Sequence, residues 1–174
     1  MTPIRVFAYG SLIWRPGFAA LRRERAVLPG WARRFWQAST DHRGFPHAPG
    51  RVVTLVRDDV ARCEGFAFEI DAASADDVLA ALDVRESGGY ERTRVALQRP
   101  DGAALGDAWV WIAHPGNPHW AGGEHDDAVI AQIHHAVGPS GANLEYVLAL
   151  ADALVAEGID DDEVEGLAAR LRAR

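Results

Sequence analysis

The sequence predicts an α+β fold in which a largely antiparallel sheet or barrel packs with helices. Most segments with strand-like alternation precede most segments with helical periodicity. The strand–helix–strand alternation that builds parallel sheets is not seen. The chain has 174 residues, which fit one domain covering residues 1–174. Its 48% content of hydrophobic residues is enough for a sizeable core.

The strands are expected where apolar and polar residues alternate between turn residues. The first covers residues 4–9 and is halted by Gly10-Ser11. A turn is expected near Asp58-Asp59, a hairpin turn at Asp101-Gly102, and a long loop at residues 39–50. Further strands are expected at residues 33–37, 51–56, 64–70, 91–98 and 107–113.

Helical periodicity predicts one helix in the middle of the chain and two or three helices at its end. Ser74 and Asp77 have the spacing of a capping box at the start of the first. In the third helix, Tyr146 falls on the side opposite the apolar stripe. A tyrosine there either points its hydroxyl into a cleft or covers a neighbouring loop. The helices are expected at residues 74–86, 126–137, 142–157 and 163–172. The core stripe of the third comprises Leu144, Val147, Leu148, Ala151, Leu154 and Val155.

Composition argues against several classes of protein. A net charge of −7 is unfavourable for a general binder of nucleic acid or acidic membranes. All 18 basic residues are arginine, which removes lysine Schiff-base and P-loop chemistry. No apolar run has the length of a membrane span, and the first residues lack a signal-peptide pattern. The single cysteine, Cys63, is expected in the core of a cytoplasmic protein.

Glu86 is the residue that helical geometry singles out for catalysis. It lies four residues after Leu82, so it continues the apolar face of the first helix. Burial and the negative end of the helix dipole both increase the proton affinity of a carboxylate there. Glu86 is therefore a candidate proton carrier near neutral pH. The alternative is a glutamate that bends to solvent or pairs with an arginine. Arg85 is adjacent, but consecutive helix residues point in different directions.

The segment Tyr9-Gly10-Ser11-Leu12 directly follows the first strand. A glycine there lets the backbone turn sharply, so that successive N–H groups can hold a carboxylate or phosphate. The alternative is an ordinary strand-ending turn. Ser11 is not surrounded by a Gly-x-Ser-x-Gly elbow, which argues against a nucleophilic role.

The histidines and tryptophans give no clear site. No His-Glu-x-x-His or paired-cysteine signature accompanies the seven histidines, so no metal site is predicted. Trp109 and Trp111 share one strand face, which favours a core role over a ligand platform.

Six ordered motifs, taken together, resemble the ChaC family of glutathione-specific γ-glutamylcyclotransferases. The resemblance runs from near the N-terminus to Tyr146. The motifs are Tyr9-Gly-Ser-Leu-Ile-Trp14, Arg34-Phe-Trp-Gln37, Ser39-Thr-Asp-His-Arg-Gly44, Pro49-Gly-Arg-Val-Val-Thr-Leu55, Leu82-Asp-x-Arg-Glu-x-Gly-Gly-Tyr90 and Gly138-Pro-Ser-Gly-x-Asn-x-Glu-Tyr146.

The resemblance implies a γ-glutamylcyclotransferase-like fold, a small mixed or antiparallel barrel or strongly curved sheet flanked by helices. It also implies a lyase that converts glutathione into 5-oxoproline and Cys-Gly without metal or organic cofactor. The catalytic residue would be Glu86. Tyr146 is expected to bind substrate, and Arg51 is a weaker candidate for the glycyl carboxylate. The substrate loop would be Ala8, Tyr9, Gly10, Ser11, Leu12 and Ile13.

Two alternatives remain open from the sequence. The pocket could act on other γ-glutamyl peptides or γ-glutamyl amines, since the contacts to the Cys-Gly half are not located. A non-catalytic metabolite-binding domain on the same scaffold is the second alternative, although a binder has no need of a partly buried proton acceptor. The expected partner is a small molecule, and the sequence does not indicate an oligomeric state.

Overall fold

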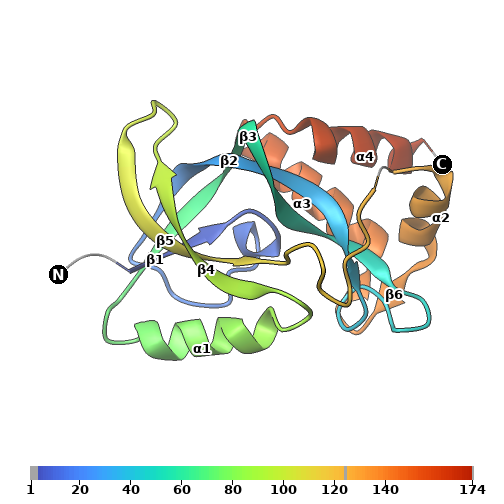
Figure 1. Cartoon of the computed structure of the whole chain (residues 1–174), viewed down its shortest axis with the longest axis horizontal. Coiled ribbons are helices and arrows are strands. Elements are labelled where there is room, and N and C mark those ends of the chain that lie inside the picture. The colour runs from blue at the N-terminus through green and yellow to red at the C-terminus, as the bar shows by residue number, and fades with distance from the viewer. Residues whose placement is uncertain (1–3, 124, 174) are drawn as a thin grey trace. The chain divides into compact units, whose positions relative to one another are not determined.

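The computed structural model describes residues 4–123 and 125–173. The chain folds into two compact units, each assembled from two separate stretches of sequence. The first contains the residues up to Arg33 together with Leu55–Ala113, and the second contains Arg34–Thr54 together with the residues from His114 onward. Figure 1 shows the elements of both units in the order of the chain.

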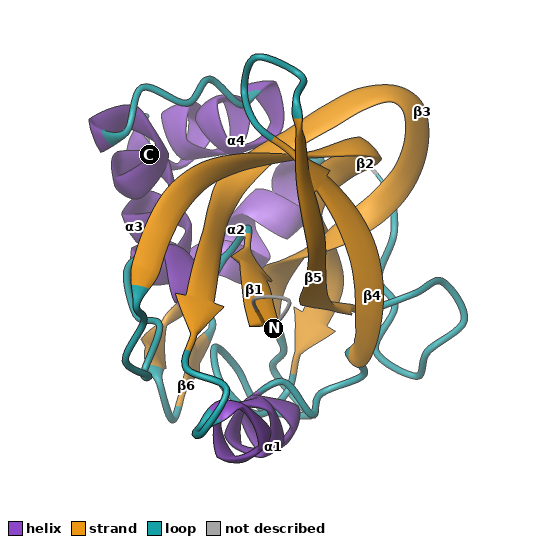
Figure 2. Cartoon of the chain, turned by 90° about the vertical axis from the view of Figure 1, so that its left-hand side faces the viewer, coloured by secondary structure: helices purple, strands orange, loops and turns teal. Residues whose placement is uncertain are grey.

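Five strands form a closed barrel in the order β1-β3-β2-β4-β5, and Figure 2 shows their strong curvature. β1 (Ile4–Ala8) lies antiparallel to β3 (Gly50–Ile70) and parallel to β5 (Ala104–Ile112). β4 (Glu91–Gln98) pairs antiparallel with β5, and β2 covers Arg22–Ser39. Together with the helices, this mixed barrel confirms the predicted α+β class.

β1 ends against a glycine of β3. Ala8 is paired with Phe66, the residue after Gly65. A Cβ atom on Gly65 would lie 2.2 Å from the carbonyl oxygen of Ala8 and 3.1 Å from a ring atom of Phe7. Two backbones approach this closely only where one residue lacks a side chain. Gly65 therefore fixes the place at which the chain leaves the first strand.

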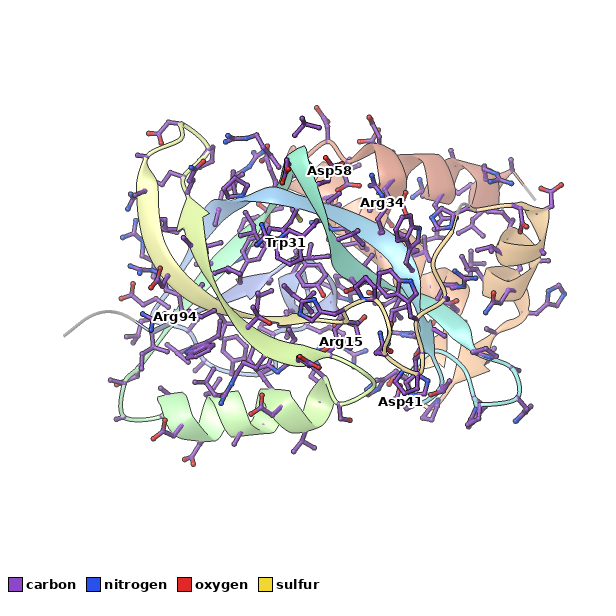
Figure 3. The ribbon with its side chains drawn as sticks, in the orientation of Figure 1. Arg15, Trp31, Arg34, Asp41, Asp58 and Arg94 are labelled. Atoms are coloured by element: carbon purple, nitrogen blue, oxygen red, sulfur yellow. The ribbon has the colours of Figure 1, made fainter. Side chains whose placement is uncertain are left out.

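Strands β2 and β3 are longer than the sequence predicts. β2 runs through Pro29-Gly30, where Gly30 takes a left-handed φ of 77°. β3 continues through Asp58, labelled in Figure 3, so the predicted turn at this position is wrong. Polar residues on an outward strand face have the composition of a turn, which explains the error. The Arg57 guanidinium lies 4.3 Å from the ring centroid of Trp31 and joins the two strands here.

Helix α1 (Ala75–Arg85) follows β3 in the first unit and buries Leu79 and Leu82. These two residues belong to the apolar face that the sequence predicts for this helix. The predicted capping box is wrong, because no side-chain hydrogen bond caps the helix start. The hydroxyl of Ser74 instead donates to the carbonyl oxygen of Asp71 at 3.3 Å.

The second unit carries the other three helices at the predicted places. They are α2 (Asp127–His135), α3 (Asn143–Ala156) and α4 (Asp162–Arg172). A two-stranded hairpin of β6 (Val137–Gly138) and β7 (Gly141–Ala142) separates α2 from α3. Among the described residues, no helix combines the length and the apolar character needed to cross a membrane.

The predicted core stripe of α3 is partly wrong. Tyr146 lies on the buried face, with 6% of its surface exposed, whereas Val155 is 67% exposed. The helix is rich in apolar residues all round, so its sequence fits two overlapping stripes, and packing selects between them. The amide of buried Asn143 helps this choice, because it accepts from the N–H of Arg51 at 2.7 Å and donates to its carbonyl at 2.8 Å. The buried residues are Asn143, Tyr146, Val147, Leu150, Ala151 and Leu154.

Glu163 ties α4 to the part of β2 that belongs to the same unit. Its Oε1 accepts hydrogen bonds from the backbone N–H of Phe35 at 3.1 Å and from Nε2 of His125 at 2.7 Å. Burial alone would raise the pKa of Glu163, but the hydrogen bonds from His125 and Phe35 outweigh it and lower the pKa below its ordinary value. The ionised carboxylate is therefore part of the folded state.

Candidate active site

Glu86 is the first residue beyond α1. Its backbone N–H still donates to the carbonyl of Leu82 at 2.8 Å, but its φ of −97° and ψ of 30° are no longer helical. Its side chain is 20% exposed, so the carboxylate is neither fully buried nor on the open surface. This half-burial is what the helical periodicity predicts for a residue four positions after buried Leu82. The predicted increase in its proton affinity stays a prediction.

Arg85 connects this carboxylate to the turn that follows β1. Its Nε lies 3.4 Å from Oε1 of Glu86. One terminal nitrogen donates to the carbonyls of Arg15 at 2.7 Å and Pro16 at 3.2 Å, and the other donates to the hydroxyl of Ser11 at 3.0 Å. Consecutive helix residues point in different directions, so a regular helix does not bring Arg85 and Glu86 together. The pair forms where Glu86 has left the helical conformation.

The turn begins at Tyr9, whose carbonyl is held by a buried arginine. Nε of Arg33 donates to this carbonyl at 2.7 Å, and one terminal nitrogen of Arg33 donates to the carbonyl of Glu64 at 2.6 Å. Arg33 is only 2% exposed. In a trans peptide the C=O and the following N–H point in opposite directions. The N–H of Gly10 therefore points away from Arg33.

The same geometry orients the next two peptides. A short 3-10 helix, Ser11–Ile13, follows Gly10. The carbonyl of Gly10 accepts from the N–H of Ile13 at 2.9 Å, and that of Ser11 accepts from the N–H of Arg15 at 2.8 Å. The N–H groups of Ser11 and Leu12 therefore point the other way. Among the described residues, no hydrogen bond is donated by the N–H of Gly10, Ser11 or Leu12.

Trp111 of β5 holds both parts of this arrangement. Its carbonyl accepts from the hydroxyl of Tyr9 at 2.7 Å, which anchors the start of the turn. Its indole Nε1 donates to Oδ1 of Asp83 at 3.0 Å, which anchors the last turn of α1. The other carboxylate oxygen of Asp83 lies 3.4 Å from the guanidinium of Arg92. The carboxylate-bearing helix end and the turn are thus attached to one strand.

In the predicted substrate loop, most side chains are part of the fold, and backbone groups remain for a ligand. Ala8 is paired in the sheet, and the side chains of Tyr9, Leu12 and Ile13 are buried. The N–H of Ile13 is already used within the turn. The groups of the loop that remain for a ligand are thus the backbone N–H groups described above.

Tyr146 belongs to the second unit, whereas Glu86 and the turn belong to the first. Its hydroxyl accepts from the backbone N–H of Val53 at 3.3 Å. The Arg43 guanidinium lies 5.5 Å from its ring centroid, and Phe35 meets the ring edge-on. These contacts fix the ring and hold its hydroxyl against β3.

Arg51, the weaker candidate for a carboxylate contact, is bound to neutral acceptors. Its Nε donates to the side chain of Gln132 at 3.3 Å, and one terminal nitrogen donates to the carbonyls of Phe35 and Gly122, each at 3.4 Å. Burial lowers the pKa of Arg51 from its ordinary value, and the charge of Asp126 opposes this. These bonds give Arg51 a role within the second unit that the sequence did not predict.

Sequence reasoning missed the positioning roles of Arg33 and Asp83 and did not predict the bonds of Arg85. Asp83 and Arg85 lie in the same motif as Glu86, so their spacing was a usable signal. Arg33 gave none, because a charged residue in a strand normally faces solvent. No group of three or more His, Cys, Asp or Glu side chains is placed to hold a metal within residues 4–123 and 125–173.

The arrangement in the first unit combines two chemical capacities. A half-buried carboxylate can accept and return a proton. A turn in which the N–H groups of residues 10–12 donate no hydrogen bond within the described part of the chain can hold a negatively charged oxygen. Both are attached to β5 and joined to each other through Arg85. Acid–base chemistry on a substrate with an anionic or carbonyl oxygen is what this site can perform.

The fold places the chain among proteins with the γ-glutamylcyclotransferase-like fold. A crystal structure of a glutathione-specific γ-glutamyl cyclotransferase from yeast superposes with a TM-score of 0.91 at 29% identity, covering 99% of this chain and 97% of the yeast chain. The family model described as ChaC-like protein matches residues 4–174. The chain belongs to the ChaC-like protein family.

Two sequence relatives are named as glutathione-specific gamma-glutamylcyclotransferases. Glutathione-specific gamma-glutamylcyclotransferase 1 of Homo sapiens is 40% identical over 150 residues, which cover 84% of this chain and 68% of the human protein. Glutathione-specific gamma-glutamylcyclotransferase of Saccharomyces cerevisiae is 33% identical over 197 residues, covering 87% of this chain and 85% of the yeast protein.

Proposed function

We propose that this chain is a lyase that cleaves glutathione by cyclising its γ-glutamyl group, which gives 5-oxoproline and Cys-Gly. Membership of the family and the names of the similar proteins support this function. The structural observation that carries it is the half-buried carboxylate of Glu86, linked through Arg85 to Ser11 in the turn after β1. Proton carrier and oxygen-binding turn then belong to one small site.

The reaction needs little more than these groups. The α-amine of the glutamyl group attacks its own γ-carbonyl carbon, a five-membered lactam closes, and the bond to the cysteinyl nitrogen breaks. Because the attack is intramolecular, holding the chain folded supplies much of the acceleration, about 7 kcal/mol or more in well-oriented systems. The amine arrives mostly protonated and cannot attack in that form. A base must first remove its proton.

Glu86 is proposed for that role. Its carboxylate takes the proton from the ammonium group and later returns a proton to the departing cysteinyl nitrogen. The attacking nitrogen loses a second proton once it has bonded to the γ-carbon, and this proton ends on the released amine. Two protons thus pass from the attacking nitrogen to the departing nitrogen, and none is gained or lost overall. The partial burial of the side chain supports this role, because a fully solvated carboxylate holds a proton too weakly to return it near neutral pH.

The turn is proposed to bind the glutamyl end of the substrate. The N–H groups of Gly10, Ser11 and Leu12 would donate to the α-carboxylate or to the developing oxyanion of the γ-carbonyl. The surrounding residues of the predicted loop, Ala8 to Ile13, hold this backbone in place. Tyr146 is proposed as a further substrate contact, supported by its position at the end of the Gly138–Tyr146 motif.

We also propose that residues 1–174 act as one domain, because the family match spans both compact units. The small-molecule substrate agrees with a net charge of −7, which is unfavourable for nucleic-acid binding. A cytoplasmic location is proposed as well. It is supported by the buried position of the single cysteine, Cys63.

The test is to incubate the purified chain with reduced glutathione and measure 5-oxoproline and Cys-Gly by mass spectrometry. Oxidised glutathione and γ-Glu-Ala, run in parallel, define substrate scope. Glutathione binding with no product after long incubation would show that the chain is a binding protein and not an enzyme. Equal turnover of γ-Glu-Ala would widen the substrate to γ-glutamyl peptides in general.

Replacing Glu86 by Gln tests the proposed base directly. We expect the variant to fold normally and turnover to fall by about 100-fold or more, because the amide cannot accept the proton. Glu91→Gln, at an exposed position of β4, is the matched control and should keep wild-type turnover. Substantial 5-oxoproline release by the Glu86→Gln protein would show that another group carries the proton.

A further inference from the structure

Arg85 bonds to several groups of the first unit in addition to the Glu86 carboxylate. Its side chain is 31% exposed, and its Nε lies 3.4 Å from Oε1 of Glu86. Through its two terminal nitrogens it also reaches the hydroxyl of Ser11 and the carbonyls of Arg15 and Pro16. The rigid, planar guanidinium of Arg85 thus contacts both the Glu86 carboxylate and the residues that follow the turn after β1.

The chain around this guanidinium is shaped to receive it. A Cβ atom on Gly17 would lie 3.2 Å from one terminal nitrogen of Arg85, so a side chain at this position would crowd the guanidinium. Gly17 also has a φ of 76°, which L side chains rarely adopt. The conformation of residues 15–17 and the place of Arg85 therefore depend on each other.

We propose that Arg85 is a positioning residue that sets the distance between the Glu86 carboxylate and the N–H groups of the turn. The inference rests on the proposed function, since it assigns to Arg85 the alignment of that site. A single planar fork fixes several acceptors at once, whereas a lysine ammonium acts as a point charge on a flexible stem. The proposal therefore requires the shape of arginine as well as its charge.

The charge of Arg85 has an effect on Glu86 that does not depend on the shape of the guanidinium. A cation 3.4 Å from Oε1 of Glu86 favours the ionised carboxylate and so opposes the effect of partial burial, which favours the protonated form. The ionised form is the one that can take the proton of the substrate amine. Other charged groups near the end of α1 are Asp83, on the preceding turn, and Arg92, which pairs with Asp83 from β4. Arg85 Nε lies 3.4 Å from Oε1 of Glu86.

Two substitutions separate shape from charge. Arg85→Lys keeps the charge and loses the fork, so kcat should fall by about 10- to 100-fold while the acidic limb of the kcat/KM pH profile stays near that of the wild type. Arg85→Met loses both, so kcat should fall at least as far and the acidic limb should move to higher pH. Arg94→Met, which breaks the exposed pair with Asp107, is the matched control and should change neither (Figure 3).

Hydrogen exchange gives a readout that does not depend on catalysis. The N–H groups of Ile13, Trp14 and Arg15 are hydrogen-bonded within the turn. Without the fork, these three amides should exchange faster in both Arg85 variants than in the wild type or the Arg94→Met control. If Arg85→Met unfolds, hydrogen exchange is measured on Arg85→Lys, which lacks the fork but retains the charge next to Glu86.

The outcomes distinguish this inference from the proposed function. A wild-type protein that releases no 5-oxoproline would reject the function, and exchange in the turn would still test the role of Arg85. In an active enzyme, an Arg85→Lys variant with wild-type kcat and unchanged exchange at residues 13–15 would overturn the positioning role. Equal pH profiles for Arg85→Met and the wild type would overturn the role of its charge.

Discussion

Gly65→Ala tests whether the close approach of β1 to β3 sets the position of the catalytic turn. The added methyl group would lie 2.2 Å from the carbonyl oxygen of Ala8, whereas real Cβ atoms keep at least 3.0 Å from such neighbours. The two backbones must therefore separate by about 0.8 Å. The displaced residue is two positions before Gly10, so the movement passes directly into the turn.

The expected effect has two parts. Overpacking a buried site costs about 1–3 kcal/mol of unfolding free energy. A displacement approaching 1 Å in a site that depends on orientation lowers kcat by about 10-fold or more. Urea denaturation measures the first, and 5-oxoproline release at saturating glutathione measures the second.

Gly166→Ala is the matched control for this experiment. Gly166 lies in α4 with open space where a methyl group would go, since no atom outside its own helix backbone and chain neighbours lies within 4 Å of its ideal Cβ position. Alanine there should stabilise the protein by about 0.5–1 kcal/mol and leave turnover unchanged. If Gly65→Ala retained wild-type kcat despite a loss of stability, the turn would not take its position from this strand contact.

Two further predictions concern the second unit. Tyr146→Phe removes the hydroxyl that accepts from the buried N–H of Val53, so we expect a loss of about 1–3 kcal/mol in urea denaturation; a rise in KM for glutathione would support a substrate contact, and an unchanged KM would remove Tyr146 from the site. The lowered pKa of Glu163 means that its ionised form stabilises the fold at neutral pH and that this contribution is lost as the pH falls through the lowered value. Glu163→Gln should therefore be less stable than the wild type at pH 7 and lose less stability on acidification, and parallel stability–pH curves for the two proteins would refute this reasoning.

Much of the fold could be predicted because its elements carry regular periodicity. The strand at residues 91–98 and the helix ending at Arg85 follow directly from spacing. The long strands could not be predicted in full, because polar residues such as Asp58 have the same composition in an exposed strand as in a turn. The buried side of α3 was also ambiguous, since a helix apolar on most of its surface does not define one face.

For the candidate site, spacing located Glu86 and the glycine turn but not the groups that hold them. The partial burial of Glu86 followed from its position four residues after Leu82 in the sequence. The contact between Arg85 and Ser11 joins residues 74 positions apart, and no local pattern encodes such a separation. The buried position of Arg33 depends on backbone carbonyls from two other segments, which only the folded chain brings to it.

Trp111 has a consequence for how this protein tolerates sequence change. Its carbonyl and its indole ring are bonded to two elements that are far apart in the chain order, the exit of β1 and the end of α1. Phenylalanine could fill the same space, yet it would release Asp83 while keeping Tyr9. The end of α1 would then keep its bonds to the turn through Arg85 but would lose its bond to β5. Substitutions at 111 and 83 should therefore show strong epistasis, and either one alone should be harder to accept than both together.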